Sequence, residues 1–269
     1  MILTDEKLAR LLEPSLQRIL VVEPNLASAR MLSELLKGVG AGQIHLAQTA
    51  AQALAVCKLL EPQVVFTEVG ENQYGLAFVR ALRRSSLTCR EAPVIVVTAQ
   101  ATAGVIVAAR NAGVHEFLRK PFAARDLNRR LEAAILASRD WIEAVGYVGP
   151  DRRRFNSADY QGPRKRLADQ APMAPAARLD QALKIARSAI AALESDPAQA
   201  LRSLQVQTSQ LKAVAAALAE PRLAAAASKL QLALSRASVE AGLSRPAIES
   251  AAADLWPFLA PEPETRAVA

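Results

Sequence analysis

The sequence predicts an α/β domain with a doubly wound, five-stranded parallel sheet, followed by an all-α four-helix bundle. Short apolar runs alternate with longer amphipathic segments over the first half of the 269 residues, as expected for repeated βα units. Residues 141–177 then lose apolar periodicity and accumulate Gly, Pro and Arg. From Arg178 onward, Ala and Leu recur with helical spacing.

These changes of pattern divide the chain. We expect a helical extension at 1–16, the α/β domain at 17–140, a basic linker at 141–177, the helical domain at 178–259 and a disordered tail at 260–269. The predicted strands are the short apolar runs Ile19–Val22, Gln43–Leu46, Val64–Thr67, Val94–Thr98 and Glu116–Leu118. The helices that follow them are Leu26–Val39, Ala50–Leu60, Tyr74–Arg84, Ala101–Ala112 and Ala124–Ala137.

The helical domain shows apolar faces and proline-marked helix starts. Pro197, Pro221 and Pro246 each fall in the first turn of a predicted helix, where proline costs no hydrogen bond. The residues expected in its core are Leu179, Leu183, Ala186, Ile190, Leu193, Leu201, Leu204, Leu211, Val214, Leu218, Leu223, Ala227, Leu230, Leu234, Ile248, Leu255 and Phe258.

Composition excludes several classes of protein. No apolar run reaches the ~20 residues that span a membrane, and the acidic start lacks the basic and apolar regions of a secretory signal, so we expect a cytoplasmic protein with no membrane insertion. Cys57 and Cys89 lack metal-ligand spacing and are expected to be small core residues or inert thiols. No Walker loop, GxSxG or HExxH motif appears, and no compact helix-turn-helix, so we expect neither an enzyme nor a sequence-specific DNA-binding protein.

Chemistry in a doubly wound domain gathers at the carboxyl ends of the strands. Those positions carry Glu23-Pro24, Glu68, Thr98-Ala99 and Lys120-Pro121. The surrounding stretches Ile-Leu-Val-Val-Glu-Pro, Pro-Gln-Val-Val-Phe-Thr-Glu, Val-Ile-Val-Val-Thr-Ala and Phe-Leu-Arg-Lys-Pro-Phe resemble the signatures of the response regulator receiver family, whose fold is flavodoxin-like and CheY-like. The resemblance implies a bacterial two-component or phosphorelay pathway.

The resemblance also implies roles for these positions. In the family an acidic pair holds magnesium, an aspartate accepts phosphoryl, a hydroxyl residue contacts it, and a lysine neutralises it. Thr98 and Lys120 match the last two roles, and Phe117 matches the switch aromatic. Pro24 replaces half of the acidic pair, and Glu68 stands at the acceptor position.

These departures argue against phosphorylation. The extra methylene of Glu68 displaces its oxygen by about 1 Å, an offset that is costly to catalysis. A cage without one carboxylate binds magnesium weakly, so we expect no cofactor, with a weak magnesium site at Glu23 and Glu68 as the alternative. Two interpretations of Glu68 remain open. In the first, its carboxylate mimics a phosphoryl group: it contacts Lys120 and holds Thr98 and Phe117 in an active-like arrangement. In the second, Glu23, Glu68 and Lys120 form an ion cluster without signalling content.

The helical domain resembles a histidine phosphotransfer domain around Leu211-Lys212. Ser209 stands at the place of the reactive histidine and Ala213 at that of a glycine, and the chain's two histidines, His45 and His115, lie in the α/β domain. The bundle therefore cannot carry phosphoryl on histidine. A docking face near Ser209 and Lys212, and a plain dimerisation or capping bundle, are both kept as interpretations.

The linker repeats a short basic motif. Tyr147-Val-Gly-Pro-Asp-Arg-Arg recurs as Tyr160-Gln-Gly-Pro-Arg-Lys-Arg, and residues 147–167 hold six basic residues against two acidic ones: Arg152, Arg153, Arg154, Arg164, Lys165 and Arg166 are the basic ones. A solvated hinge, a protein-docking segment, and a site for nucleic acid or a nucleotide second messenger such as cyclic di-GMP all fit this pattern.

The leading functional hypothesis is a non-catalytic signalling adaptor that acts without aspartate phosphorylation. Its expected partners are signalling proteins: a histidine kinase, a receiver, or a motility or cell-cycle component. The alternatives are an effector that binds a nucleotide or nucleic acid through the linker, and a conventional phosphorylated response regulator.

Overall fold

The computed structural model describes residues 5–70, 73–137, 139–152, 174–236 and 244–259. The chain forms two units. The first comprises residues 1–142 and 147–164, and the second comprises residues 143–146 and 165–269. We call them the receiver-like unit and the helical unit. Within the described residues, no helix combines the length and the hydrophobicity that crossing a membrane requires.

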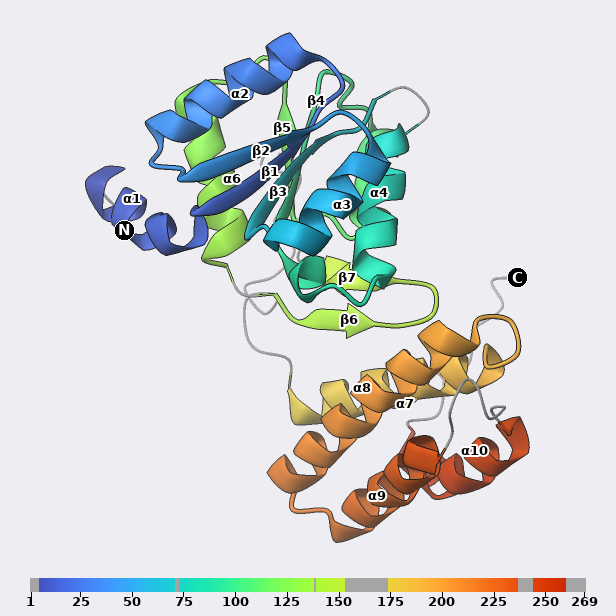
Figure 1. The fold of residues 1–269 in the computed structure, drawn as a ribbon. Coiled ribbons are helices and arrows are strands. Elements are labelled where there is room, and N and C mark those ends of the chain that lie inside the picture. Colours follow the sequence, from blue (N-terminus) through green and yellow to red (C-terminus); the bar gives the residue numbers. More distant parts are fainter. Residues whose placement is uncertain (1–4, 71–72, 138, 153–173, 237–243, 260–269) are drawn as a thin grey trace, which may run out of the picture. The chain divides into compact units, whose positions relative to one another are not determined.

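Five parallel strands form the sheet of the receiver-like unit, as predicted, in the order β2-β1-β3-β4-β5 (Figure 1). The strands are β1 (Arg18–Val22), β2 (Gln43–Ala47), β3 (Val64–Glu68), β4 (Val94–Thr98) and β5 (Glu116–Arg119). The helices are α1 (Asp5–Leu12), α2 (Leu26–Gly38), α3 (Ala50–Leu60), α4 (Tyr74–Arg84), α5 (Ala103–Ala112) and α6 (Ala124–Ile135), with short 3-10 turns η1 (Glu13–Ser15) and η3 (Thr88–Glu91).

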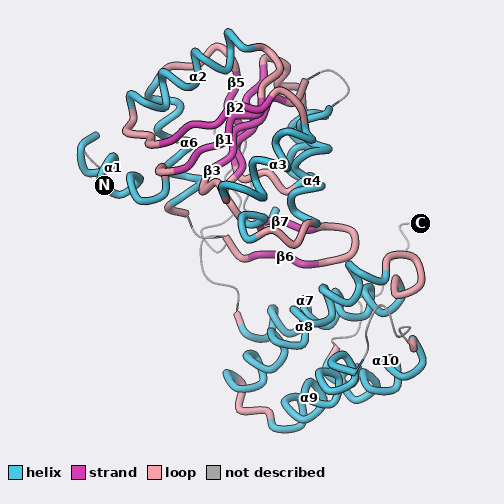
Figure 2. The backbone as a smooth tube through the Cα atoms, in the orientation of Figure 1, coloured by secondary structure: helices cyan, strands magenta, loops and turns pink. Residues whose placement is uncertain are grey.

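Helices cover both faces of this sheet, which explains its continuous apolar strands (Figure 2). Successive residues of β1 point to opposite faces: Ile19 packs with α2 and α6, whereas Leu20 packs with α3, α4 and α5. One helix start differs from prediction. Thr102 accepts a hydrogen bond from Val105 N at 3.3 Å, so α5 begins at Ala103 and not at Ala101.

A fully buried arginine organises the amino-terminal ends of β4 and β5. Arg83 of α4 donates hydrogen bonds to the carbonyl oxygens of Gly113 at 2.9 Å and Ala92 at 2.9 Å, and also to that of Arg90. Its remaining terminal nitrogen lies 3.2 Å from His115 Nδ1. The side chain thus supplies donors to carbonyl groups that would otherwise be buried without partners.

Regular structure continues beyond residue 140, where the sequence predicted a linker. Strands β6 (Trp141–Glu143) and β7 (Val148–Pro150) form a two-stranded sheet. The guanidinium groups of Arg83 and Arg90 stack on the indole ring of Trp141. Their Cζ atoms lie 5.4 Å and 5.6 Å from the centre of that ring. Three-residue strands are too short to give a periodic signal, so the sequence analysis missed them.

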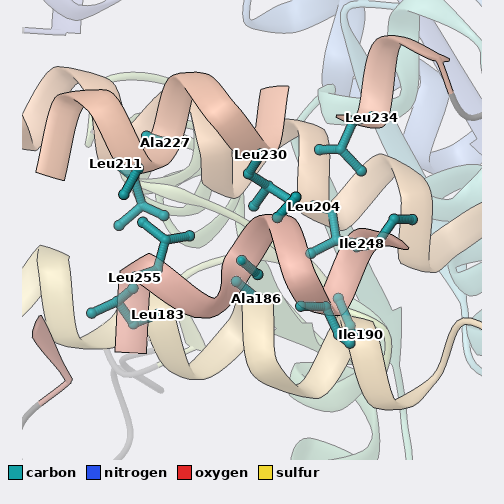
Figure 3. Packing of buried hydrophobic residues seen from close by; sticks show 14 of the residues in the cluster. Leu183, Ala186, Ile190, Leu204, Leu211, Ala227, Leu230, Leu234, Ile248 and Leu255 are labelled. Atoms are coloured by element: carbon teal, nitrogen blue, oxygen red, sulfur yellow. The ribbon is translucent and has the colours of Figure 1, made fainter. Parts of the chain in front are cut away.

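Four helices make up the described part of the helical unit, in agreement with the prediction, and their apolar side chains pack against one another (Figure 3). They are α7 (Pro175–Ala191), α8 (Pro197–Ala217), α9 (Pro221–Arg236) and α10 (Arg245–Ala252), and the 3-10 turn η6 (Ala253–Phe258) follows. Most of the predicted apolar residues are buried in one core. Leu218 is a wrong core prediction: it is the C-cap of α8 and 42% exposed.

A row of buried polar residues on α8 holds residues 143–146 within the helical unit. Gln199 Nε2 donates to Glu143 Oε1 at 2.7 Å, and Ser203 Oγ donates to the carbonyl oxygen of Glu143 at 2.8 Å. Gln207 Nε2 donates to the same carbonyl oxygen at 3.2 Å. These hydrogen bonds explain why polar side chains that recur at helical spacing on α8 can be buried: each has a hydrogen-bond partner.

Stability is expected to fall on acidification because of His115. Burial, followed by the charges of Arg83 and Arg139, holds the pKa of His115 well below its usual value. Below about pH 6.5 the unfolded chain binds a proton at this residue and the folded chain does not, so the free energy of unfolding decreases as pH falls. The loss is about 1.4 kcal/mol at pH 5.5 for an unfolded pKa of about 6.5.

The substitution His115→Asn measures this contribution, because the amide oxygen can accept the hydrogen bond that Val94 N donates to Nδ1 at 3.2 Å. Urea unfolding at pH 7.5 and 5.5, values about one unit on either side of the usual histidine pKa, is compared for the two proteins. The variant should lose less stability between these values than the wild type. Equal losses would contradict the assignment.

Candidate functional site

Three charged side chains from separate strand ends meet at the carboxyl edge of the sheet. Glu23 follows β1, Glu68 ends β3, and Lys120 follows β5. Lys120 Nζ lies 2.6 Å from Glu68 Oε2 and 3.0 Å from Glu23 Oε2. We call these three residues the edge cluster. It lies at the predicted place because parallel strands end at the same edge.

The second oxygen of each carboxylate is bound to the backbone. Asn25 N donates to Glu23 Oε1 at 3.0 Å, and Val69 N donates to Glu68 Oε1 at 3.2 Å. Each carboxylate is therefore fixed at one oxygen by an amide and at the other by the ammonium group. The side chain of Glu68 is 15% exposed and that of Glu23 is 10% exposed, so water reaches both only in part.

A backbone hydrogen bond places Lys120 beside the end of β4. Its backbone N donates to the carbonyl oxygen of Thr98 at 2.8 Å, and its peptide bond to Pro121 is cis. Burial alone lowers the pKa of Lys120, but the hydrogen bonds and charges of Glu68 and Glu23 outweigh it and raise the pKa above its ordinary value. The ammonium form is thus the one that the cluster stabilises.

Thr98 ends β4, and Phe117 lies in β5, the strand that precedes Lys120. Thr98 is buried, and its hydroxyl oxygen accepts a hydrogen bond from Gln100 N at 3.1 Å, which is local to the loop after β4. Phe117 of β5 is 5% exposed and belongs to the apolar core beneath α3, α4 and α5. The aromatic ring therefore points into the protein.

Tyr74, the first residue of α4, also belongs to this site, although the sequence pattern did not predict it. A Cβ on Gly70, which has φ +67°, would lie 1.8 Å from the ring of Tyr74, and a Cβ on Gly75 would lie 1.8 Å from the carbonyl oxygen of Glu68. Burial, then the charges of Glu23 and Glu68, raise the pKa of the Tyr74 phenol. Two glycines on either side of a tyrosine just after a strand were the available signal.

The donor set does not fit a magnesium ion. Both carboxylates are bound to Lys120, whose ammonium group occupies the position between them. Pro24 adds no ligand oxygen from its side chain, and the described residues hold no group of three acidic, histidine or cysteine side chains that could bind a metal. Magnesium requires several oxygen ligands in octahedral geometry, which this pair does not provide.

The other predicted site residues lie elsewhere. In the basic linker, Arg152 Nη1 donates to Asn111 Oδ1 at 3.3 Å, and its guanidinium lies 5.3 Å from the centre of the Tyr147 ring. The linker's further basic residues lie outside the described ranges: Arg153, Arg154, Arg164, Lys165 and Arg166.

On the helical unit, Ser209 and Lys212 are both exposed on α8. Ser209 Oγ donates to the carbonyl oxygen of Gln205 at 3.1 Å, and Lys212 Nζ donates to Gln231 Oε1 of α9 at 2.8 Å. The structure places the two residues on one helix, one turn apart.

Known proteins resemble the receiver-like unit. Residues 19–132 match the response regulator receiver domain family. The KDP operon transcriptional regulatory protein KdpE of Escherichia coli is 31% identical over 118 residues, covering 44% of this chain and 50% of that protein. The DNA-binding response regulator MtrA of Mycobacterium tuberculosis strain H37Rv is 29% identical over 127 residues, covering 46% of this chain and 53% of MtrA. The chain spans about half the length of the curated relatives it matches.

Solved structures cover the same part of the chain. A sensor protein from Polaromonas sp. JS666 has 30% sequence identity and a TM-score of 0.40, with 44% of this chain and 94% of that chain covered. The chemotaxis protein CheY4 of Vibrio cholerae has 23% identity and a TM-score of 0.41, with 44% of this chain and 97% of that chain covered.

Magnesium is expected to leave the wild-type protein unaffected. At ~10 mM MgCl2 the melting temperature should stay within about 1 °C, because a ligand stabilises only the state that binds it. The variant Pro24→Asp/Glu68→Asp restores an acidic pair and shortens the third carboxylate, so its melting temperature should rise with magnesium by several degrees. Differential scanning fluorimetry measures both, with KCl at equal ionic strength as the control. Equal magnesium shifts in the two proteins would contradict the assignment.

Proposed function

With residues 19–132 forming a response regulator receiver domain, we propose that this chain serves two-component signalling as a non-catalytic adaptor that exchanges no phosphoryl group. The observation that carries the proposal is the bonding of Glu68. Its two oxygens are held by Lys120 Nζ at 2.6 Å and Val69 N at 3.2 Å. An acceptor carboxylate has to place an oxygen in line with the phosphodonor beside a metal ion, whereas both oxygens of Glu68 already accept hydrogen bonds from the protein and the two carboxylates do not fit magnesium.

The same geometry supports a permanent active-like state. Lys120 contacts the Glu68 carboxylate as it would contact a phosphoryl oxygen, by a short charge-assisted hydrogen bond. Phe117 is buried in the core, which is the inward position that the switch hypothesis requires. In this proposal the receiver domain always presents the same binding-competent surface. Signalling is then controlled by the concentration of the partner protein and not by phosphorylation.

The partners proposed for this surface are other signalling proteins of the pathway: a histidine kinase, a further receiver domain, or a motility or cell-cycle component. Charge supports protein recognition. The edge cluster joins two carboxylates and one ammonium group, so it carries a net negative charge close to the surface. A partner with a basic or hydrogen-bond-donating side chain can contact it without displacing Lys120.

Small phosphodonors are expected not to modify the wild-type protein. After incubation with acetyl phosphate and magnesium, intact-mass spectrometry should show no phosphoryl adduct, because the extra methylene of Glu68 displaces its oxygens from the reacting position and both oxygens are held by Lys120 and Val69. The Pro24→Asp/Glu68→Asp variant is the positive control for donor and conditions. An adduct on the wild type that maps to Glu68 would overturn the proposal.

The permanent active-like state is tested with Glu68→Gln, which keeps the shape of the side chain and removes its charge. Full-length protein captures partners from the native host, and the affinity for each captured partner is measured by calorimetry. We expect the variant to bind about tenfold more weakly, because Lys120 loses its strongest contact.

The matched control is Glu34→Gln on α2, whose carboxylate is 72% exposed and pairs with Lys37. It should bind as the wild type does. If Glu68→Gln also binds as the wild type does, the edge cluster is a structural ion cluster and the switch interpretation fails, while adaptor binding itself remains measured by the wild-type affinity.

A further inference from the structure

The fold brings the chain's two cysteines together. Cys57 lies in the last turn of α3 and Cys89 lies in η3, 32 residues later in the sequence. Cys89 Sγ donates to the carbonyl oxygen of Cys57 at 3.4 Å, and both side chains are buried in the same apolar core. Sequence spacing gave no sign of this pair.

Both cysteines are held in place by their surroundings. Glu61 N donates to the carbonyl oxygen of Cys57 at 3.2 Å, which fixes the end of α3. Thr88, next to Cys89, donates its hydroxyl to Glu61 Oε1, and Arg83 binds the carbonyl oxygen of Arg90 on the other side. The proximity of the two cysteines is therefore a property of two anchored segments.

The two thiols differ in access and in acidity. Cys57 is completely buried, whereas Cys89 is 7% exposed. The hydrogen bond from Cys57 lowers the pKa of Cys89, while the same bond and burial raise the pKa of Cys57. Cys89 is thus the thiol that ionises and meets solvent first, and Cys57 stays protonated beside it.

From this geometry we propose that Cys57 and Cys89 form a dithiol site that hydroperoxides oxidise to an intramolecular disulfide. The Cys89 thiolate attacks the terminal peroxide oxygen and the O–O bond breaks, which gives a sulfenic acid at Cys89 and releases hydroxide from hydrogen peroxide or alkoxide from an organic hydroperoxide. The Cys57 sulfur then attacks the sulfenic sulfur, its thiol proton leaves with the displaced oxygen, and water departs as the S–S bond forms. Two thiols lose two electrons and the peroxide gains them.

The disulfide would close a loop from residue 57 to residue 89, which contains β3, Glu68 and α4. Cross-linking constrains the unfolded chain, so the oxidised protein should melt at a higher temperature, by about 5 °C. A reductant should reverse this shift. The inference concerns the receiver-like unit alone and does not depend on the proposed adaptor function.

The test treats reduced full-length protein with a small excess of hydrogen peroxide, alkylates it in denaturant and records intact mass and peptide maps. The expected wild-type product has lost two hydrogens, takes up no alkylating agent, and yields one cross-linked peptide pair containing Cys57 and Cys89. Dithiothreitol should restore two alkylation sites. Two alkylation sites after peroxide treatment, or cross-links only between molecules, would overturn the proposal.

Two variants assign the roles of the thiols. Cys57→Ser should accumulate a sulfenic acid at Cys89 that dimedone traps, because no resolving thiol is present. Cys89→Ser should leave Cys57 at least tenfold less reactive towards peroxide, since that thiol is buried and protonated. Equal reactivity of the two variants would refute the assigned order, and the wild-type mass decides the disulfide itself if either variant fails to fold.

Discussion

The carboxyl edge of the sheet depends on one ammonium group placed between two carboxylates. Parallel topology brings Glu23 and Glu68 together, and both are largely shielded from water. Two like charges in such a place repel each other and lose hydration unless a cation compensates them. Lys120 supplies that cation from the end of β5, the second strand from β3 in the sheet, so this site carries its counter-ion within the chain.

Sequence patterns predicted the sheet and the strand ends well, because apolar runs and strand topology are local or nearly local properties. The place of Glu23, Glu68 and Lys120 followed from counting to the ends of three strands. The roles of Tyr74 and Arg83 did not follow. Arg83 is a basic residue in the last turn of a helix, a pattern that normally indicates a solvated position, and only the meeting of η3, Gly113 and His115 around it makes it fully buried.

The helical unit shows the same limit. Leucine and alanine spacing predicted its helices and most of its core, since packing follows the apolar face. Another face of α8 carries the polar residues Gln199, Ser203 and Gln207. From the sequence alone, such a face is predicted to be exposed to solvent. All three are buried because they bond to Glu143, a residue far earlier in the chain. Hydrogen bonds between polar residues far apart in the chain produce no periodic pattern in the sequence.

Exposure distinguishes two of the polar clusters in the described part of the receiver-like unit. Arg83, at the amino-terminal ends of the strands, is completely buried and its hydrogen bonds are satisfied, which favours a single rigid arrangement. Lys120, at the carboxyl edge, keeps 23% of its side chain exposed, so an approaching protein can reach its cluster. Rigidity at one end and access at the other are compatible with the proposal that partner proteins contact the carboxyl edge. Trp141 also stacks on Arg83, and Asp151 N donates to the carbonyl oxygen of Asp140 at 2.8 Å. A fragment that isolates this unit therefore has to extend past Ser138 to Asp151, because a shorter one uncovers the buried arginine.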